Sequence, residues 1–201
     1  MENSIENPKI WYPHEAFYIE SMLTITRTAM AEHSMLKTIL EEVTNGKTTK
    51  RVLIIDLAQN IVSHAAAISR YFWPSNNEKM HKLRGQRLRE AFEIHESNPI
   101  KNKDVRNFVE HFDEKLDDYL KENFAGAFYP DFIGSKNDCE NQVSHFFRAF
   151  FIDEWKFHVL GKESNLVPII NELIRIHQLL EKYRDQGGRL PKSNEKNKNN
   201  S

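Results

Sequence analysis

Three residues near the middle of the chain have the chemistry needed to cut RNA: Arg106, Asn107 and His111. Cleavage without a metal ion needs a group that moves protons as the 2′-hydroxyl attacks the neighbouring phosphate, and imidazole does so near pH 7. The charge that grows on the phosphate needs a cation, which a guanidinium supplies. The pattern predicts His111 as general base and acid, Arg106 as phosphate stabiliser and Asn107 as the residue that orients the ring, with no metal and no other cofactor.

These residues open the stretch with the clearest helical pattern in the sequence, residues 103–124. Its apolar residues recur every three or four positions and charged residues fill the rest. On one helix Arg106 and His111 are separated by about 140°, so a single copy cannot easily bring both to one phosphate. A two-fold dimer with these helices face to face can, and we expect a homodimer. An ordinary solvated helix face is the alternative, because Arg27/His33 and Arg89/His95 have similar spacing.

An arginine followed directly by a polar residue, with a histidine after four to six residues, resembles the signature of the HEPN superfamily. Arg106, Asn107 and His111 match it, and the run RNFVEHFDEKLDDYL is similar to that region in bacterial members. The resemblance implies a helical bundle that dimerises with its motifs facing each other. It also implies a metal-independent ribonuclease, of the kind found as toxins paired with nucleotidyltransferase antitoxins and in phage defence. The resemblance is specific over this run and only architectural over residues 14–124.

A polar line runs along the predicted helix 50–72, through Asp56, Asn60 and His64. Steps of four residues place all three on one face of a helix that is otherwise apolar nearly all round. An Asp–His pair in such surroundings can bias a histidine toward proton transfer. The alternatives are an exposed stripe or a buried network whose members satisfy one another.

The predicted helix 78–94 is rich in lysine and arginine, and Lys82, Arg84 and Arg87 are our candidates for contacts with an RNA backbone. The same charges can instead pair with the acidic face of helix 103–124, which is the commoner use of charge between helices. Glu78 and His81 have the spacing of a metal-ligand pair, but a di-metal helical site needs two such pairs. We therefore predict no metal site.

The apolar spacing predicts helices over residues 14–43, 50–72, 78–94, 103–124 and 165–184. The aromatic and β-branched segments 144–152 and 155–160 predict a small β-hairpin, with a short helix across 143–151 as the alternative. Residues 126–143 read as a loop. The expected fold is mainly α: an antiparallel helical bundle over 14–124, then the hairpin and a closing helix over 144–186. We expect a single domain over 1–186 and a disordered tail over 187–201.

Composition restricts the remaining classes of function. The chain has 201 residues and a formal net charge of −1, so any site for a polyanion must be a local patch. The single cysteine, Cys139, excludes an internal disulfide and a multi-cysteine zinc site. Residues 1–13 lack the apolar core of a signal peptide, and residues 52–68 look too short and too polar to span a membrane. We expect a cytoplasmic protein with no membrane contact.

A non-catalytic helical binding module in a defence or regulatory complex is the rival function, and a nucleotide-binding or small-molecule-binding helical domain is a third.

Overall fold

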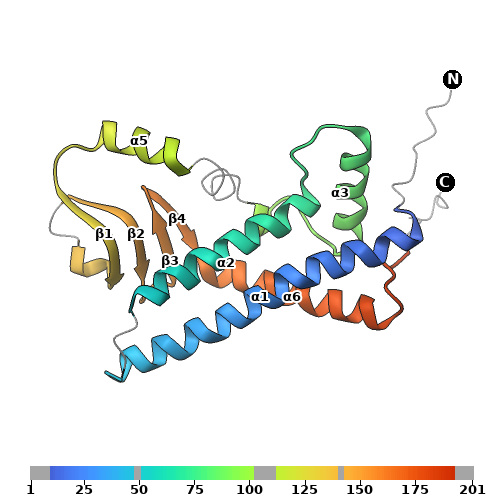
Figure 1. Cartoon of the computed structure of the whole chain (residues 1–201), viewed down its shortest axis with the longest axis horizontal. Helices are drawn as coiled ribbons and strands as arrows, with labels where there is room; N and C mark the ends of the chain where they lie inside the picture. The colour runs from blue at the N-terminus through green and yellow to red at the C-terminus, as the bar shows by residue number, and fades with distance from the viewer. Residues whose placement is uncertain (1–9, 48–50, 102–111, 140–142, 193–201) are drawn as a thin grey trace, which may run out of the picture.

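The computed structural model describes residues 10–47, 51–101, 112–139 and 143–192. Within these residues the protein is mostly helical, with a small mixed sheet at one end (Figure 1). The mainly α class that the sequence predicts is therefore confirmed. The predicted catalytic residues Arg106, Asn107 and His111 lie outside the described residues.

Two long helices form the spine of the molecule. Helix α1 (Tyr12–Thr44) has 33 residues and is about 50 Å long. It ends at Thr44, just before Asn45 and Gly46, and Gly46 takes a φ of 67°, which glycine adopts without steric cost. Helix α2 (Arg51–Phe72) runs back along it, so that residues near the start of α1 meet the end of α2. Buried isoleucine, leucine and alanine side chains fill the space between them.

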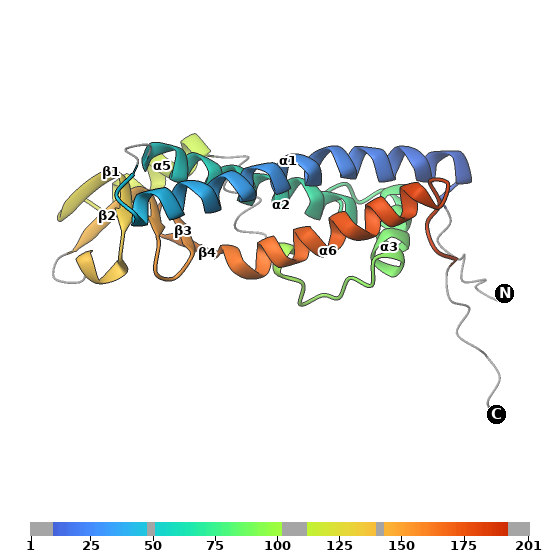
Figure 2. The same ribbon diagram turned by 90° about the horizontal axis from the view of Figure 1, so that it is seen from below.

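Two further helices complete the helical part. Helix α6 (Leu166–Asp185) lies along α1 (Figure 2), and its amphipathic spacing buries Leu173, Ile176 and Leu180. Helix α3 (Lys79–Ala91) lies against the end of α2, at the far end of the molecule from the sheet. Gly85 permits this approach, because a Cβ there would stand 2.7 Å from the carbonyl oxygen of Phe72. A short 3₁₀ turn, η1 (Pro99–Lys101), follows α3.

The sheet is larger than the predicted hairpin. Its strands β1 (Ala127–Gly134), β2 (Ser144–Phe151), β3 (Lys156–Val159) and β4 (Lys162–Asn165) lie in chain order. β2, β3 and β4 pair antiparallel, whereas β1 is parallel to β2, and the turn η2 (Lys136–Cys139) lies in the connection between them. Residues 143–151 thus contain a strand, and the helix considered as an alternative for them is not formed.

Strand β1 falls where the sequence predicted a loop, so that prediction is wrong over residues 127–134. Pro130 and Gly134 within it argue against a strand in the centre of a sheet. β1 is an edge strand, however, and an edge position needs no N–H bond on its outer side. Helix α5 (Phe112–Glu122) precedes β1 and is the described part of the predicted helix 103–124.

Helix α2 is longer and more apolar than we expected for residues 52–68. Its residues Val52–Phe72 are long and apolar enough to cross a membrane by length and composition alone. Of that apolar window, 56% is buried inside the fold, and fully buried residues such as Ile54, Ile61 and Ile68 belong to the main core. The buried part of α2 thus packs in the main core, as it does in the core helix of a soluble protein.

Candidate functional site

The segment that carries the predicted catalytic motif connects two described elements. Before it, Lys101 at the end of η1 pairs with Glu96 and lies 5.6 Å from the centre of the Trp73 ring, just past the end of α2. After it, α5 begins at Phe112. The acidic face of α5 makes local ion pairs, since Asp118 lies 3.9 Å from both Lys115 and Lys121.

The three predicted RNA-binding residues of α3 occupy three different environments. Lys82 is exposed and Arg84 is half-buried. Arg87 is buried: its guanidinium donates a hydrogen bond to the carbonyl oxygen of Pro191 and lies 3.8 Å from the buried carboxylate of Glu15. Arg87 therefore ties the C-terminal segment to α1 and α3, and its charge is engaged inside the protein instead of facing a ligand.

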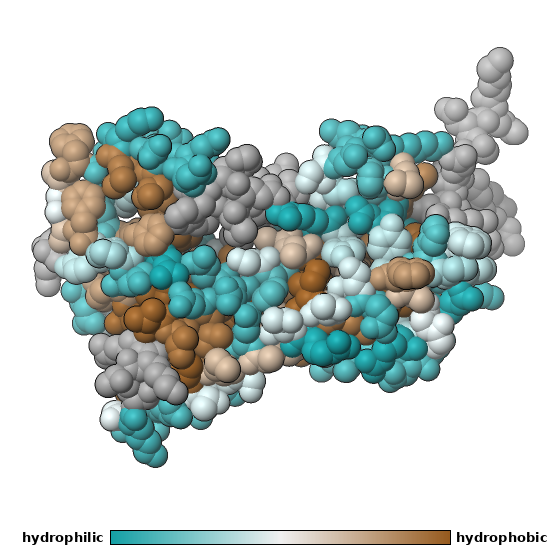
Figure 3. All heavy atoms as spheres, in the orientation of Figure 1, coloured by the Kyte–Doolittle hydropathy of each residue, from teal (hydrophilic) through white to brown (hydrophobic). Residues whose placement is uncertain are grey.

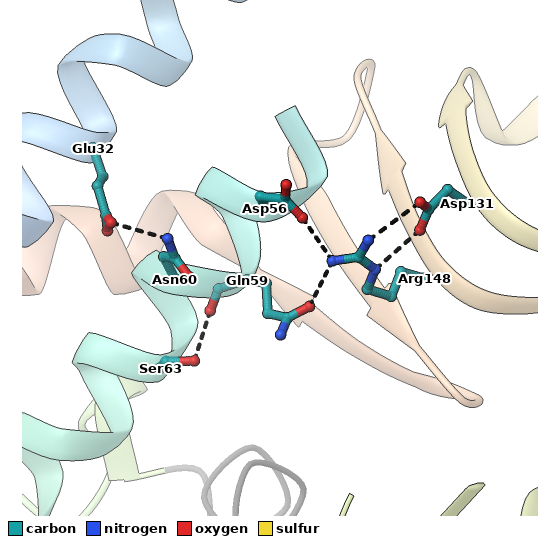
Figure 4. A network of polar contacts seen from close by, with 7 residues as sticks. All are labelled: Glu32, Asp56, Gln59, Asn60, Ser63, Asp131 and Arg148. Atoms are coloured by element: carbon teal, nitrogen blue, oxygen red, sulfur yellow. Dashed lines mark hydrogen bonds and ion pairs between the residues drawn. The ribbon is translucent and has the colours of Figure 1, made fainter. Parts of the chain in front are cut away.

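The polar line Asp56–Asn60–His64 does not form an Asp–His pair. Asn60 donates to Glu32 of α1 at 3.0 Å, and His64 Nε2 lies 3.0 Å from the other carboxylate oxygen of Glu32, off the direction of a hydrogen bond. Asp56 instead accepts a bond from Arg148 of β2 (Figure 4). Each member of the line thus meets a partner on another element, and the line connects α2 to α1 and to β2. Glu32 Oε2 is left without a hydrogen bond from any described residue, so this is not a fully satisfied network.

Arg148 is the centre of this network and was not singled out in the sequence. It donates two bonds to Asp131 of β1, at 2.9 and 3.2 Å, and others to Asp56 and Gln59 of α2 (Figure 4). Burial alone would lower the pKa of its guanidinium, but the bonds to Asp131 and Asp56 raise it. The signal was a single arginine inside the aromatic run SHFFRAFF. Because Arg148 bonds to both β1 and α2, it ties the sheet to α2, and we call it the clamp.

A groove at the other end of the molecule presents charge and aromatic rings to solvent. It lies where α1, the end of α2 and the start of α3 meet, and it encloses about 680 Å³. We call it the tyrosine–arginine groove, after Tyr18, Tyr71, Arg70 and Arg84. The described residues that line it are Tyr18, Ile25, Ala67, Arg70, Tyr71, Pro74, Ser75, Asn76, His81 and Arg84.

Arg84 lies between the two tyrosines of this groove. Its guanidinium carbon is 5.8 Å from the centre of each ring, and the rings of Tyr18 and Tyr71 stand perpendicular at 6.4 Å. The hydroxyl of Tyr71 shares a 2.5 Å hydrogen bond with Ser21, which fixes the position of that ring. Sequence spacing does not reveal this arrangement, because its members come from three helices.

In the described residues, no group of three His, Cys, Asp or Glu side chains is placed to hold a metal ion. Comparisons with protein-family models, with curated proteins and with solved structures found no match to this chain. The candidate site is therefore argued from its own residues, and the tyrosine–arginine groove is the described place where charge, aromatic rings and open volume meet.

Proposed function

We propose that this protein is a HEPN-like endoribonuclease that cuts RNA without a metal ion, by attack of the 2′-hydroxyl on the neighbouring phosphate. His111 moves the proton, Arg106 stabilises the charge on the phosphate, and Asn107 orients the imidazole. The observation that carries the proposal is the motif itself: Arg106, Asn107 and His111 stand immediately before the helix α5 in a mostly helical chain. The resemblance implies a toxin or phage-defence role, with a nucleotidyltransferase-type antitoxin as the partner.

The basic residues of α3 support a path for the RNA backbone. Lys82 is exposed and Arg84 lines an open groove, so both are accessible to a phosphate. Arg87 is left out of this path because it is buried against Glu15 and Pro191. In this proposal the helices act as a HEPN-like bundle that dimerises, and the sheet is an addition to it.

Growth of cells that express the protein tests the proposal. We expect wild type to slow growth and degrade cellular RNA, and His111→Ala to lose both effects with unchanged protein levels. His95→Ala is the matched control, because His95 also follows an arginine at similar spacing and its side chain is exposed. If His111→Ala and wild type behave alike, the catalytic proposal fails.

A non-catalytic interaction module is the second candidate, and one observation favours it. Apolar side chains gather at the sheet end of the molecule (Figure 3), and Phe124, Phe128 and Val143 there are 87%, 49% and 66% exposed. Exposed apolar clusters of this kind mark surfaces that bind other proteins. Equal toxicity of wild type and His111→Ala, together with intact RNA, would favour this candidate.

A further inference from the structure

The tyrosine–arginine groove has the size and the preformed character of a ligand site. Its volume of about 680 Å³ falls within the range of roughly 300–1,000 Å³ that is usual for small-molecule pockets. Five residues of its lining are half-buried, so each is anchored in the fold and still reaches the groove. They are Tyr18, Arg70, Tyr71, His81 and Arg84. The described residues of its lining come from α1, α2, the loop after α2 and α3.

The charge in the groove suits an anion. Two arginines and one histidine line it, and none of the described residues of its lining carries a carboxylate. His81 lies 3.8 Å from the exposed Glu78. Arg84 makes no ion pair with a described residue, and its buried Nε has no hydrogen-bond partner among them. Its charge is held by two aromatic faces, and a phosphate would supply the acceptors that the guanidinium lacks.

The aromatic rings in the groove suit a nucleobase. Tyrosine rings and arginine planes are the usual surfaces on which unpaired bases stack. Tyr18 and Tyr71 offer two such rings beside the guanidinium of Arg84. A phosphate and a base joined by one sugar can therefore meet a cation and a ring at the same time.

The groove is also held in position before any ligand arrives. A hydrogen bond between the hydroxyl groups of Tyr71 and Ser21 ties Tyr71 to α1. Gly85 has no Cβ, which allows α3 to pack close to the end of α2. Arg89 fixes the same contact by donating to the carbonyl oxygen of Phe72. Preorganised groups lose little conformational entropy on binding. The position of Arg84 next to both rings is thus a property of the fold.

We propose that this groove binds one nucleoside monophosphate unit, with its phosphate on Arg84 and its base against Tyr18 and Tyr71. The unit is either a free nucleotide or an unpaired nucleotide within an RNA strand, since both present the same phosphate and base. Neither the motif at Arg106–His111 nor any cleavage step is needed for this binding.

Calorimetric titration of the full chain with AMP, adenosine and inorganic phosphate tests the proposal. We expect AMP to bind more tightly than adenosine or phosphate alone. Arg84→Gln should weaken AMP binding about tenfold or more, because it removes the positive charge and the charge-assisted hydrogen bonds of the guanidinium. Arg84→Lys keeps the charge and should keep part of the affinity. Arg27→Gln on the exposed surface of α1 is the matched control and should bind as wild type does.

A second arm identifies the source of the nucleotide. We compare how tightly wild type and Arg84→Gln bind a six-residue oligoadenylate. If the substitution weakens binding of the oligoadenylate and of AMP in parallel, the ligand is a nucleotide within single-stranded RNA. If AMP alone loses affinity, the ligand is a free nucleotide. The proposal is overturned if AMP binds no better than adenosine, or if Arg84→Gln, with a wild-type melting temperature, binds AMP as wild type does. His111→Ala should bind AMP normally, which separates this result from failure of the proposed cleavage.

Discussion

Arg84 and Arg87 are three residues apart on α3, yet their surroundings give them different roles. Arg84 faces an open groove between two tyrosine rings, whereas Arg87 is buried beside Glu15. Their spacing in the sequence places both on a similar side of the helix, so composition alone could not separate them. What separates them is the C-terminal segment, which packs over Arg87 through Pro191 and leaves Arg84 uncovered.

Replacement of Arg87 should lower the free energy of unfolding of the protein. Arg87→Met keeps the unbranched apolar stem of the side chain but leaves the buried Glu15 carboxylate without its cation, which typically costs about 3–5 kcal/mol. The free energy of unfolding from urea denaturation measures this loss. The double variant Glu15→Gln/Arg87→Met should recover part of it, since both buried charges are then gone. Arg27→Met, at an exposed site, should change little, and an Arg87→Met protein as stable as wild type would refute the buried-pair account.

The helices were predictable because their apolar residues follow one period over many turns. The predicted ranges 14–43, 50–72 and 165–184 agree with α1, α2 and α6 to within two residues. The sheet was less predictable for two physical reasons. β1 contains a proline that only an edge position tolerates, and β4 is four polar residues long, with no apolar signal. The clamp at Arg148 and the tyrosine–arginine groove bring together residues from distant segments of the chain. The spacing of residues within one helix or strand does not predict such contacts.

The contact between α6 and the loop after α3 should depend on pH. Glu172 of α6 accepts hydrogen bonds from Arg175 and from Asn98, at 2.7 to 2.8 Å. Burial raises the pKa of this carboxyl, but these bonds outweigh burial and hold the pKa below its usual value of 4.5. A carboxyl with a depressed pKa in the folded state stabilises the protein above its unfolded pKa, and this contribution disappears as pH falls through the folded pKa.

Unfolding at a series of pH values checks this prediction. Wild type should be more stable than Glu172→Gln at pH 7, and the difference should shrink as the pH falls below about 4.5. Glu20→Gln, at an exposed position of α1, serves as the control for removal of one carboxylate. A difference between wild type and Glu172→Gln that stays constant or grows on acidification would show that Glu172 does not act in this way.

At the scale of the whole molecule, the account depends on assembly. Arg106 and His111 are separated by about 140° on one helix, so the proposed cleft needs the Arg106 of one copy beside the His111 of another. Mixing Arg106→Ala chains with His111→Ala chains should restore part of the ribonuclease activity, because one of the two sites in a mixed dimer then holds both residues and the other holds neither. A monomer by sedimentation that is active and needs both residues would show that the cleft is not shared.

The most direct test of the central claim is the chemistry of cleavage by the purified protein in EDTA. We predict that a single-stranded RNA is cut and leaves 2′,3′-cyclic phosphate and 5′-hydroxyl ends, because the 2′-hydroxyl is the nucleophile and no metal is needed. The same strand with 2′-O-methyl groups should stay intact, and His111→Ala should cut neither. Failure to cut the unmodified RNA, or equal cutting of both strands, would contradict the proposed ribonuclease.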